Sequence, residues 1–203
     1  MSDISKLYLR ELSIIKRRYY YLYFRTRPWI GKTIEVDVTR LEECALQMRL
    51  MIEGIVLACV HANIAYYGDV FGNLKSDWRL KELLREMKKR DILSFPQPCD
   101  YFYDKTGKAN LIVRPEKGID LFEIERIHGI MGNLLHRRYH FFDSSLSGSI
   151  IQSIIDTLPD IKEHMNNHVV YLKTDTGLVA WVSKMNIHSK KRCECLEMTL
   201  SRI

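Results

Sequence analysis

The chain has 203 residues, of which 46% are hydrophobic and 28% charged, which are ordinary values for a globular protein and exclude a disordered chain. Its 31 Lys and Arg against 25 Asp and Glu give a net charge of +6, which is compatible with a nucleic-acid partner but does not specify one. The composition also excludes a collagen, a coiled-coil rod and a disulfide scaffold. We expect one domain with a smaller appendage.

Several features of the sequence favour a cytoplasmic protein. The first residues, MSDISKLYLREL, mix an acid with bases and lack the apolar stretch of a secretory signal. The longest uncharged stretch, residues 54–68, is shorter than the about 20 residues that a membrane span needs. Five cysteines, an odd number, are typical of reduced thiols. We therefore expect a cytoplasmic location and no membrane partner.

The spacing of apolar residues predicts helices along the first two thirds of the chain. The clearest begins after a capping box of Thr39 and Glu42, whose side chains satisfy free backbone N–H groups. Two charged residues, Arg49 and Glu53, interrupt its wide apolar stripe and are neighbours on the helix surface because they are four residues apart. The predicted helices cover residues 3–24, 40–67, 76–90, 120–138 and 147–158.

The end of the chain changes to the alternating pattern of β-strands. The residues VVYLK and LVAWVSK flank a TDTG turn and predict a hairpin, to which CECLEMTL can add a third strand. A shorter hairpin of CDYFYD and KANLIVR can form before residue 115. The predicted fold class is therefore mainly α, a bundle of about five helices over residues 1–165 with a small C-terminal antiparallel β appendage over 166–203.

The fourth predicted helix carries the first candidate site. Asn133 and His136 share one helix face, and His128 lies two turns earlier on roughly the same side. An imidazole can act as general base on a ribose hydroxyl or as acid to a leaving oxygen, and an asparagine can orient it. Arg137 or Arg138 can hold a phosphate. The alternative is that both histidines are core residues hydrogen-bonded to the backbone.

The long helix with Arg49 and Glu53 in its apolar stripe, followed by a helix that reads GIMGNLLH and then by aromatic residues, resembles the HEPN superfamily. The resemblance covers the predicted bundle and rests mainly on residues 129–136. It implies a small helical bundle of the kind found in toxins, phage defence and RNA processing. The family's catalytic signature, an Arg and a His with four to six residues between them, does not occur in this chain. What carries over is His136, with Asn133 in the neighbouring polar position.

The resemblance implies an RNA-associated protein, and a metal-independent ribonuclease of a defence or toxin–antitoxin system is the activity we expect from it. In this interpretation His136 is the acid–base residue, Asn133 orients it and Arg49 holds a phosphate, with no cofactor and no metal. The expected partners are RNA, a second copy in a homodimer and a further protein. The alternative is a non-catalytic helical interaction or regulatory protein, in which Arg49 and Glu53 tie the bundle together and the β appendage docks a partner.

The basic N-terminus is a second candidate site, because residues 1–40 carry most of the excess of basic residues. Aromatic residues alternate with these bases in KRRYYYLYFRTRPW, a combination that suits phosphate contacts and base stacking on single-stranded RNA. The alternative is that the tyrosines pack between helices and the bases form a solvated face. The candidate nucleic-acid-binding residues are Arg17, Arg18, Arg25, Arg27, Arg137 and Arg138.

A zinc site of His188, Cys193 and Cys195 is a weaker hypothesis. Two cysteines with one residue between them lie on the same face of a strand, so a packed strand explains them without a metal.

Overall fold

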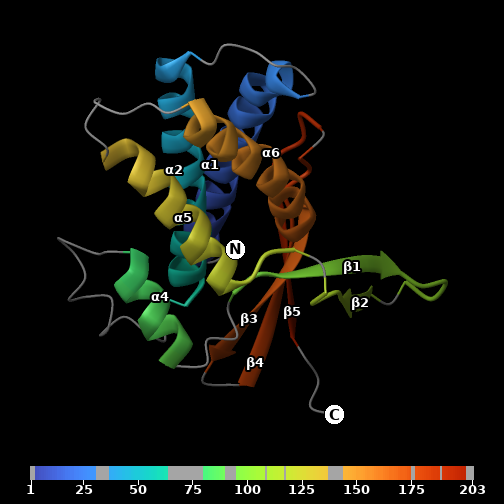
Figure 1. The fold of residues 1–203 in the computed structure, drawn as a ribbon. Coiled ribbons are helices and arrows are strands. Elements are labelled where there is room, and N and C mark those ends of the chain that lie inside the picture. The colour runs from blue at the N-terminus through green and yellow to red at the C-terminus, as the bar shows by residue number, and fades with distance from the viewer. Residues whose placement is uncertain are drawn as a thin grey trace.

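The computed structural model describes residues 3–30, 37–63, 80–89, 95–107, 109–116, 118–136, 144–174, 177–187 and 189–199 (Figure 1). Its helices are α1 (Asp3–Thr26), the short 3-10 helix η1 (Arg27–Trp29), α2 (Val38–Ala62), α4 (Leu80–Lys89), α5 (Leu121–His136) and α6 (Ser144–Asn166). Its strands are β1 (Gln97–Tyr103), β2 (Ala109–Val113), β3 (Asn167–Thr174), β4 (Gly177–Lys184) and β5 (Glu194–Thr199).

The helices follow the predicted spacing, and one of the two predicted caps is confirmed. Asp120 Oδ1 accepts the backbone N–H of Glu123 at 2.7 Å at the start of α5. The capping box predicted at Thr39 and Glu42 is wrong, because α2 begins two residues earlier than predicted and Asp37 is its N-cap, with Oδ1 accepting the N–H of Thr39 at 3.0 Å. Helix α6 continues through Pro159, which interrupts the backbone hydrogen bonding without ending the helix. The part of the second predicted helix beyond residue 63 lies outside the described residues.

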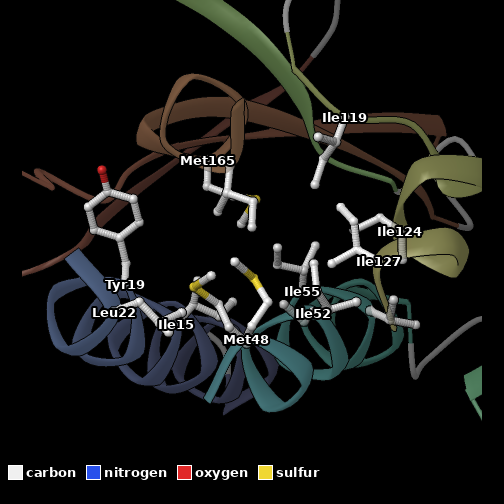
Figure 2. Close-up of a cluster of buried hydrophobic side chains, with 14 of the residues drawn as sticks. Ile15, Tyr19, Leu22, Met48, Ile52, Ile55, Ile119, Ile124, Ile127 and Met165 are labelled. Carbon is white, nitrogen blue, oxygen red and sulfur yellow. The ribbon is translucent and has the colours of Figure 1, made fainter. Parts of the chain in front are cut away.

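One apolar core joins α1, α2, α5 and α6. Helix α2 lies at its centre, and a Cβ on Gly54 would be 3.2 Å from Ile15 Cγ1, so the absence of a side chain lets α1 and α2 approach closely. Figure 2 shows how the side chains of these helices meet, among them Ile15 and Leu22 of α1, Met48, Ile52 and Ile55 of α2, Ile124 and Ile127 of α5 and Met165 of α6. By length and composition α2 could span a membrane, but 61% of its most apolar window is buried, as in the core helix of a soluble protein.

The predicted fold class is wrong about the β structure. The five strands of the described residues form one antiparallel sheet in the order β2-β1-β3-β4-β5, so the sheet is a second layer of the fold and not a small appendage. The early hairpin β1–β2 joins the later strands because Gln97 and Pro98 pair with Val169 and His168 of β3. Figure 1 shows this hairpin (green to yellow) extending away from the helices. The division into domains at residue 165 stays a prediction, although the sheet draws strands from both sides of it.

The sheet packs on α1 through a buried aromatic contact. The ring of Tyr8 lies 5.5 Å from the ring of Trp181 in β4. Tyr8 also donates a 2.5 Å hydrogen bond to His168 Nε2, and Nδ1 of the same ring donates to the carbonyl oxygen of Met165 at 2.9 Å. Since a carbonyl only accepts, the ring is the neutral tautomer with its hydrogen on Nδ1. Burial lowers the pKa of His168 to about 4.

A second buried histidine, His164, lies four residues earlier in the chain, in the last turn of α6. Nδ1 of His164 accepts the backbone N–H of Ile119 at 3.2 Å, and burial lowers the pKa of this imidazole to about 3. The ring of His164 lies directly against Gly118. This glycine has a φ of 105°, and a Cβ at its position would lie 2.3 Å from Nδ1 of His164. Glycine is therefore required at this position by both the backbone conformation and the space.

These two histidines should make the protein less stable at mildly acidic pH. The unfolded chain takes up protons below pH about 6.5, whereas the folded chain keeps both rings neutral, so stability is complete above that pH and falls below it. Urea unfolding should give a free energy lower by about 2 kcal/mol per histidine at pH 5 than at pH 7. The substitution His164→Gln should remove about half of this difference. Equal unfolding free energies of the wild type at the two pH values would contradict neutral burial.

Candidate functional site

The candidate site lies where α5 crosses α2. His128, Gly132 and His136 are spaced by four residues and form one stripe along α5. Arg49 and Glu53, one turn apart on α2, face this stripe. A Cβ on Gly132 would lie 3.4 Å from Arg49 Nη1, so the guanidinium rests against α5 where that helix has no side chain. The glycine therefore lets an arginine side chain fit between the two histidines of the stripe.

The carboxylate of Glu53 connects the two helices. Its Oε1 accepts Nε–H of Arg49 at 3.0 Å within α2 and Nε2–H of His128 at 2.9 Å across from α5. The three side chains are 19–27% exposed, so the pairs are partly shielded from water. The hydrogen bond from His128 and the bond from Arg49 lower the pKa of Glu53, against the opposing effect of burial. Glu53 is therefore ionised at neutral pH and fixes both of its partners.

His136 is the solvent-exposed member of the site. Its Nε2 lies 3.5 Å from Nη1 of Arg49, at the outer limit of a hydrogen bond. A guanidinium has only donors, so a hydrogen bond between these two groups uses the lone pair of His136 Nε2. The arrangement places a nitrogen that can accept a proton beside a fixed cation, in contact with solvent.

The structure brings together two of the three residues predicted to be catalytic. Arg49 and His136, 87 positions apart in sequence, are in contact. Asn133 is separate, because it is exposed on the side of α5 that faces α6 and lines a pocket of about 350 Å³ with Arg126 and Ser153. Arg137 and Arg138, predicted to hold a phosphate, lie outside the described residues.

The four arginines predicted on α1 and η1 have different surroundings. Arg17 and Arg27 are exposed. Arg18 is half-buried and donates to the Gln47 side chain of α2. Arg25 lies 3.8 Å from Glu43 in an exposed ion pair. These residues therefore do not act as one basic surface, because part of them ties α1 to α2.

The sequence places His128 near the site but indicates neither its partner Glu53 nor the role of Gly132. The four-residue spacing of His128, Gly132 and His136 indicates the arrangement, because it places a residue without a side chain between two imidazoles on one helix face. The sequence does not indicate which face of α5 packs on α2, because that contact joins two helices that are far apart in the chain.

The proposed zinc ligands can be described only in part. His188 lies outside the described residues. Burial raises the pKa of the Cys193 and Cys195 thiols. Among the residues that the structure describes, no three His, Cys, Asp or Glu side chains gather as a metal site would require.

No family model, no curated protein and no solved structure matches the chain. The resemblance to the HEPN superfamily therefore stays a prediction based on the motif in α5.

Replacing Glu53 by Gln should destabilise the protein, because Arg49 and His128 lose their shared anionic acceptor in a partly buried position. We expect a loss of about 1–3 kcal/mol in the free energy of urea unfolding at pH 7. The lowered pKa of Glu53 means that its contribution is present above the ordinary carboxyl pKa and is lost as the pH falls through the folded value, so the difference from wild type should shrink below pH about 4.

The matched control is Glu125→Gln on α5, whose carboxylate is 38% exposed and pairs with Lys88 at 3.5 Å. An exposed pair of this kind contributes about 0–1 kcal/mol. Equal losses for the two substitutions would show that the carboxylate between α2 and α5 has no special role.

Proposed function

We propose that the protein is an RNA-associated ribonuclease that needs no metal, with Arg49, Glu53, His128 and His136 as its active site. The observation that carries the proposal is the contact between Arg49 Nη1 and His136 Nε2, which puts a phosphate-binding cation beside an exposed imidazole. This pair can support cleavage of a phosphodiester, since the guanidinium can bind the anionic oxygens and the imidazole can transfer a proton. The resemblance of residues 129–136 to the HEPN superfamily supports the same activity.

In the proposed reaction, Arg49 binds the non-bridging oxygens of the scissile phosphate through its Nη groups. His136 Nε2 takes the proton of the ribose 2′-hydroxyl, and the 2′-oxygen forms a bond to phosphorus while the bond from phosphorus to the 5′-oxygen breaks. The leaving 5′-oxygen takes a proton from water. The products are a 2′,3′-cyclic phosphate and a 5′-hydroxyl, and the protonated imidazole loses its proton to solvent.

Glu53 and His128 act as positioning residues in this proposal. The carboxylate holds Nε of Arg49, which turns the Nη groups away from α2 and toward His136. The hydrogen bond from His128 holds the carboxylate in turn. A fixed arginine loses less conformational entropy when it binds a phosphate than a freely moving one, so this chain of bonds favours binding.

Purified protein incubated with total RNA in the presence of a chelator should produce fragments ending in 2′,3′-cyclic phosphate. His136→Ala should lower the rate by about 10² or more, the ordinary contribution of a general base. Arg49→Lys keeps the charge but not the planar fork of donors and should lower the rate by about tenfold. The measurement is the initial rate, with thermal unfolding of each variant to show that it is folded.

Arg85→Lys on α4 is the matched control, because this side chain is 67% exposed and lies outside the proposed site. It should cleave at the wild-type rate. Absence of cleavage by the wild-type protein, or equal cleavage by wild type and His136→Ala, would reject the ribonuclease. The alternative, a non-catalytic interaction protein, instead predicts that His136→Ala lowers the unfolding temperature.

The remaining expectations belong to the same proposal. A homodimer, a further protein partner, a role in defence or in a toxin–antitoxin pair and a cytoplasmic location stay predictions from the sequence.

A further inference from the structure

A basic groove runs between α1 and the segment that connects β4 to β5. Its volume is about 760 Å³. Five cations line it, two from the middle of α1 and three consecutive ones from the connecting segment, namely Lys16, Arg17, Lys190, Lys191 and Arg192. No carboxylate is among the described residues that line it. This groove is a different surface from the contact of α2 with α5 described above.

The connecting segment is held in place by Lys16. The ammonium group of this buried lysine donates to the carbonyl oxygens of Asn186, Ser189 and Lys191 at 2.7, 2.9 and 2.8 Å. Asn186, which has a φ of 52°, also donates from its side chain to the carbonyl oxygen of Arg192 at 2.9 Å. These bonds fix the backbone of the segment, so its three consecutive basic residues are presented in a set arrangement along one wall.

The other wall of the groove is aromatic. The rings of Tyr20 and Phe24, one helical turn apart on α1, lie nearly parallel at an angle of 15° with their centres 6.3 Å apart. Tyr20 is anchored by a 3.4 Å hydrogen bond to the carbonyl oxygen of Ser189. Phe24 is 61% exposed, although the removal of a phenyl ring from water is favourable. A flat, exposed ring beside a row of cations is suited to a ligand that is both aromatic and anionic.

We propose that this groove binds single-stranded nucleic acid, with bases stacked on Phe24 and phosphates on Arg17, Lys190, Lys191 and Arg192. Sequence-independent single-strand binding combines aromatic platforms with a cationic track, and both are present here. A duplex keeps its bases stacked on one another and could use only the cations. The proposal goes beyond the ribonuclease site, since a groove of this kind can hold a strand whether or not the protein cleaves it.

The test measures fluorescence anisotropy with a labelled decamer of 2′-O-methyl uridine, which lacks the hydroxyl needed for cleavage. Binding to the wild-type protein should weaken with salt, with a slope of log K against log salt concentration of about −2 to −3, as expected for three or four phosphate contacts. The triple variant K190E/K191E/R192E should bind at least tenfold more weakly. Phe24→Ala should bind at least fivefold more weakly and keep the wild-type salt slope, because it removes only stacking.

The matched control is the triple variant K81E/R85E/K105E, which makes the same change in net charge at exposed residues of α4 and of the turn between β1 and β2. It should keep the wild-type affinity within about twofold. Equal weakening by the two triple variants, equal affinity for a duplex of the same length together with no effect of Phe24→Ala, or no binding of the decamer would overturn the proposal. Binding of vesicles containing phosphatidylserine without binding of the decamer would overturn it in favour of a membrane surface.

The outcome is separable from that of the ribonuclease. Binding of the decamer without any RNA cleavage supports the groove and rejects the active site, whereas RNA cleavage without binding of the decamer does the reverse.

Discussion

The carboxylate of Glu53 is the interaction on which the candidate site depends. One oxygen accepts hydrogen bonds from its own helix and from α5, and thereby fixes a cation and an imidazole at the same time. The bonds are partly shielded from water, so they are stronger than an exposed ion pair and still leave the arginine within reach of a ligand. The position of Arg49 against Gly132 and His136 follows from this anchor.

The packing around this carboxylate explains why charged residues occur in the apolar stripe of α2. The stripe contributes Met48, Ile52 and Ile55 to the core, and the charged side chains emerge at its edge, where α5 covers them incompletely. The apolar contacts set the distance between the two helices, and the glycine in α5 leaves room for the guanidinium. Hydrophobic packing therefore supplies the stability, whereas the polar cluster supplies a defined arrangement of groups.

Local patterns in the sequence predicted most of the elements, and what they missed depends on contacts between distant segments. The helical period of α1 and α2, the cap at Asp120 and the turn between the apolar strands β3 and β4 are properties of a few neighbouring residues. The pairing of β1 with β3 through Pro98 and His168 instead joins distant segments, and local patterns therefore do not predict that the two hairpins share one sheet. The same limit applies to the site.

For the candidate residues, the sequence placed His136 and Arg49 on two amphipathic helices, but only the packing of α5 on α2 brings them into contact and turns Asn133 away. Lys16 was counted as part of a basic segment, yet its ammonium group is used to hold the backbone between β4 and β5. Helical periodicity indicates on which face of a helix a residue lies, but it does not indicate which other segment of the chain packs against that face.

The most direct measurement is a double-mutant cycle between Glu53 and His128, with the free energies of unfolding of wild type, Glu53→Gln, His128→Gln and the double variant measured at pH 7. If the carboxylate joins α2 to α5 as described, the two substitutions should be coupled by about 0.5–3 kcal/mol. Additive effects, with a coupling energy near zero, would contradict the arrangement from which the proposed active site is built.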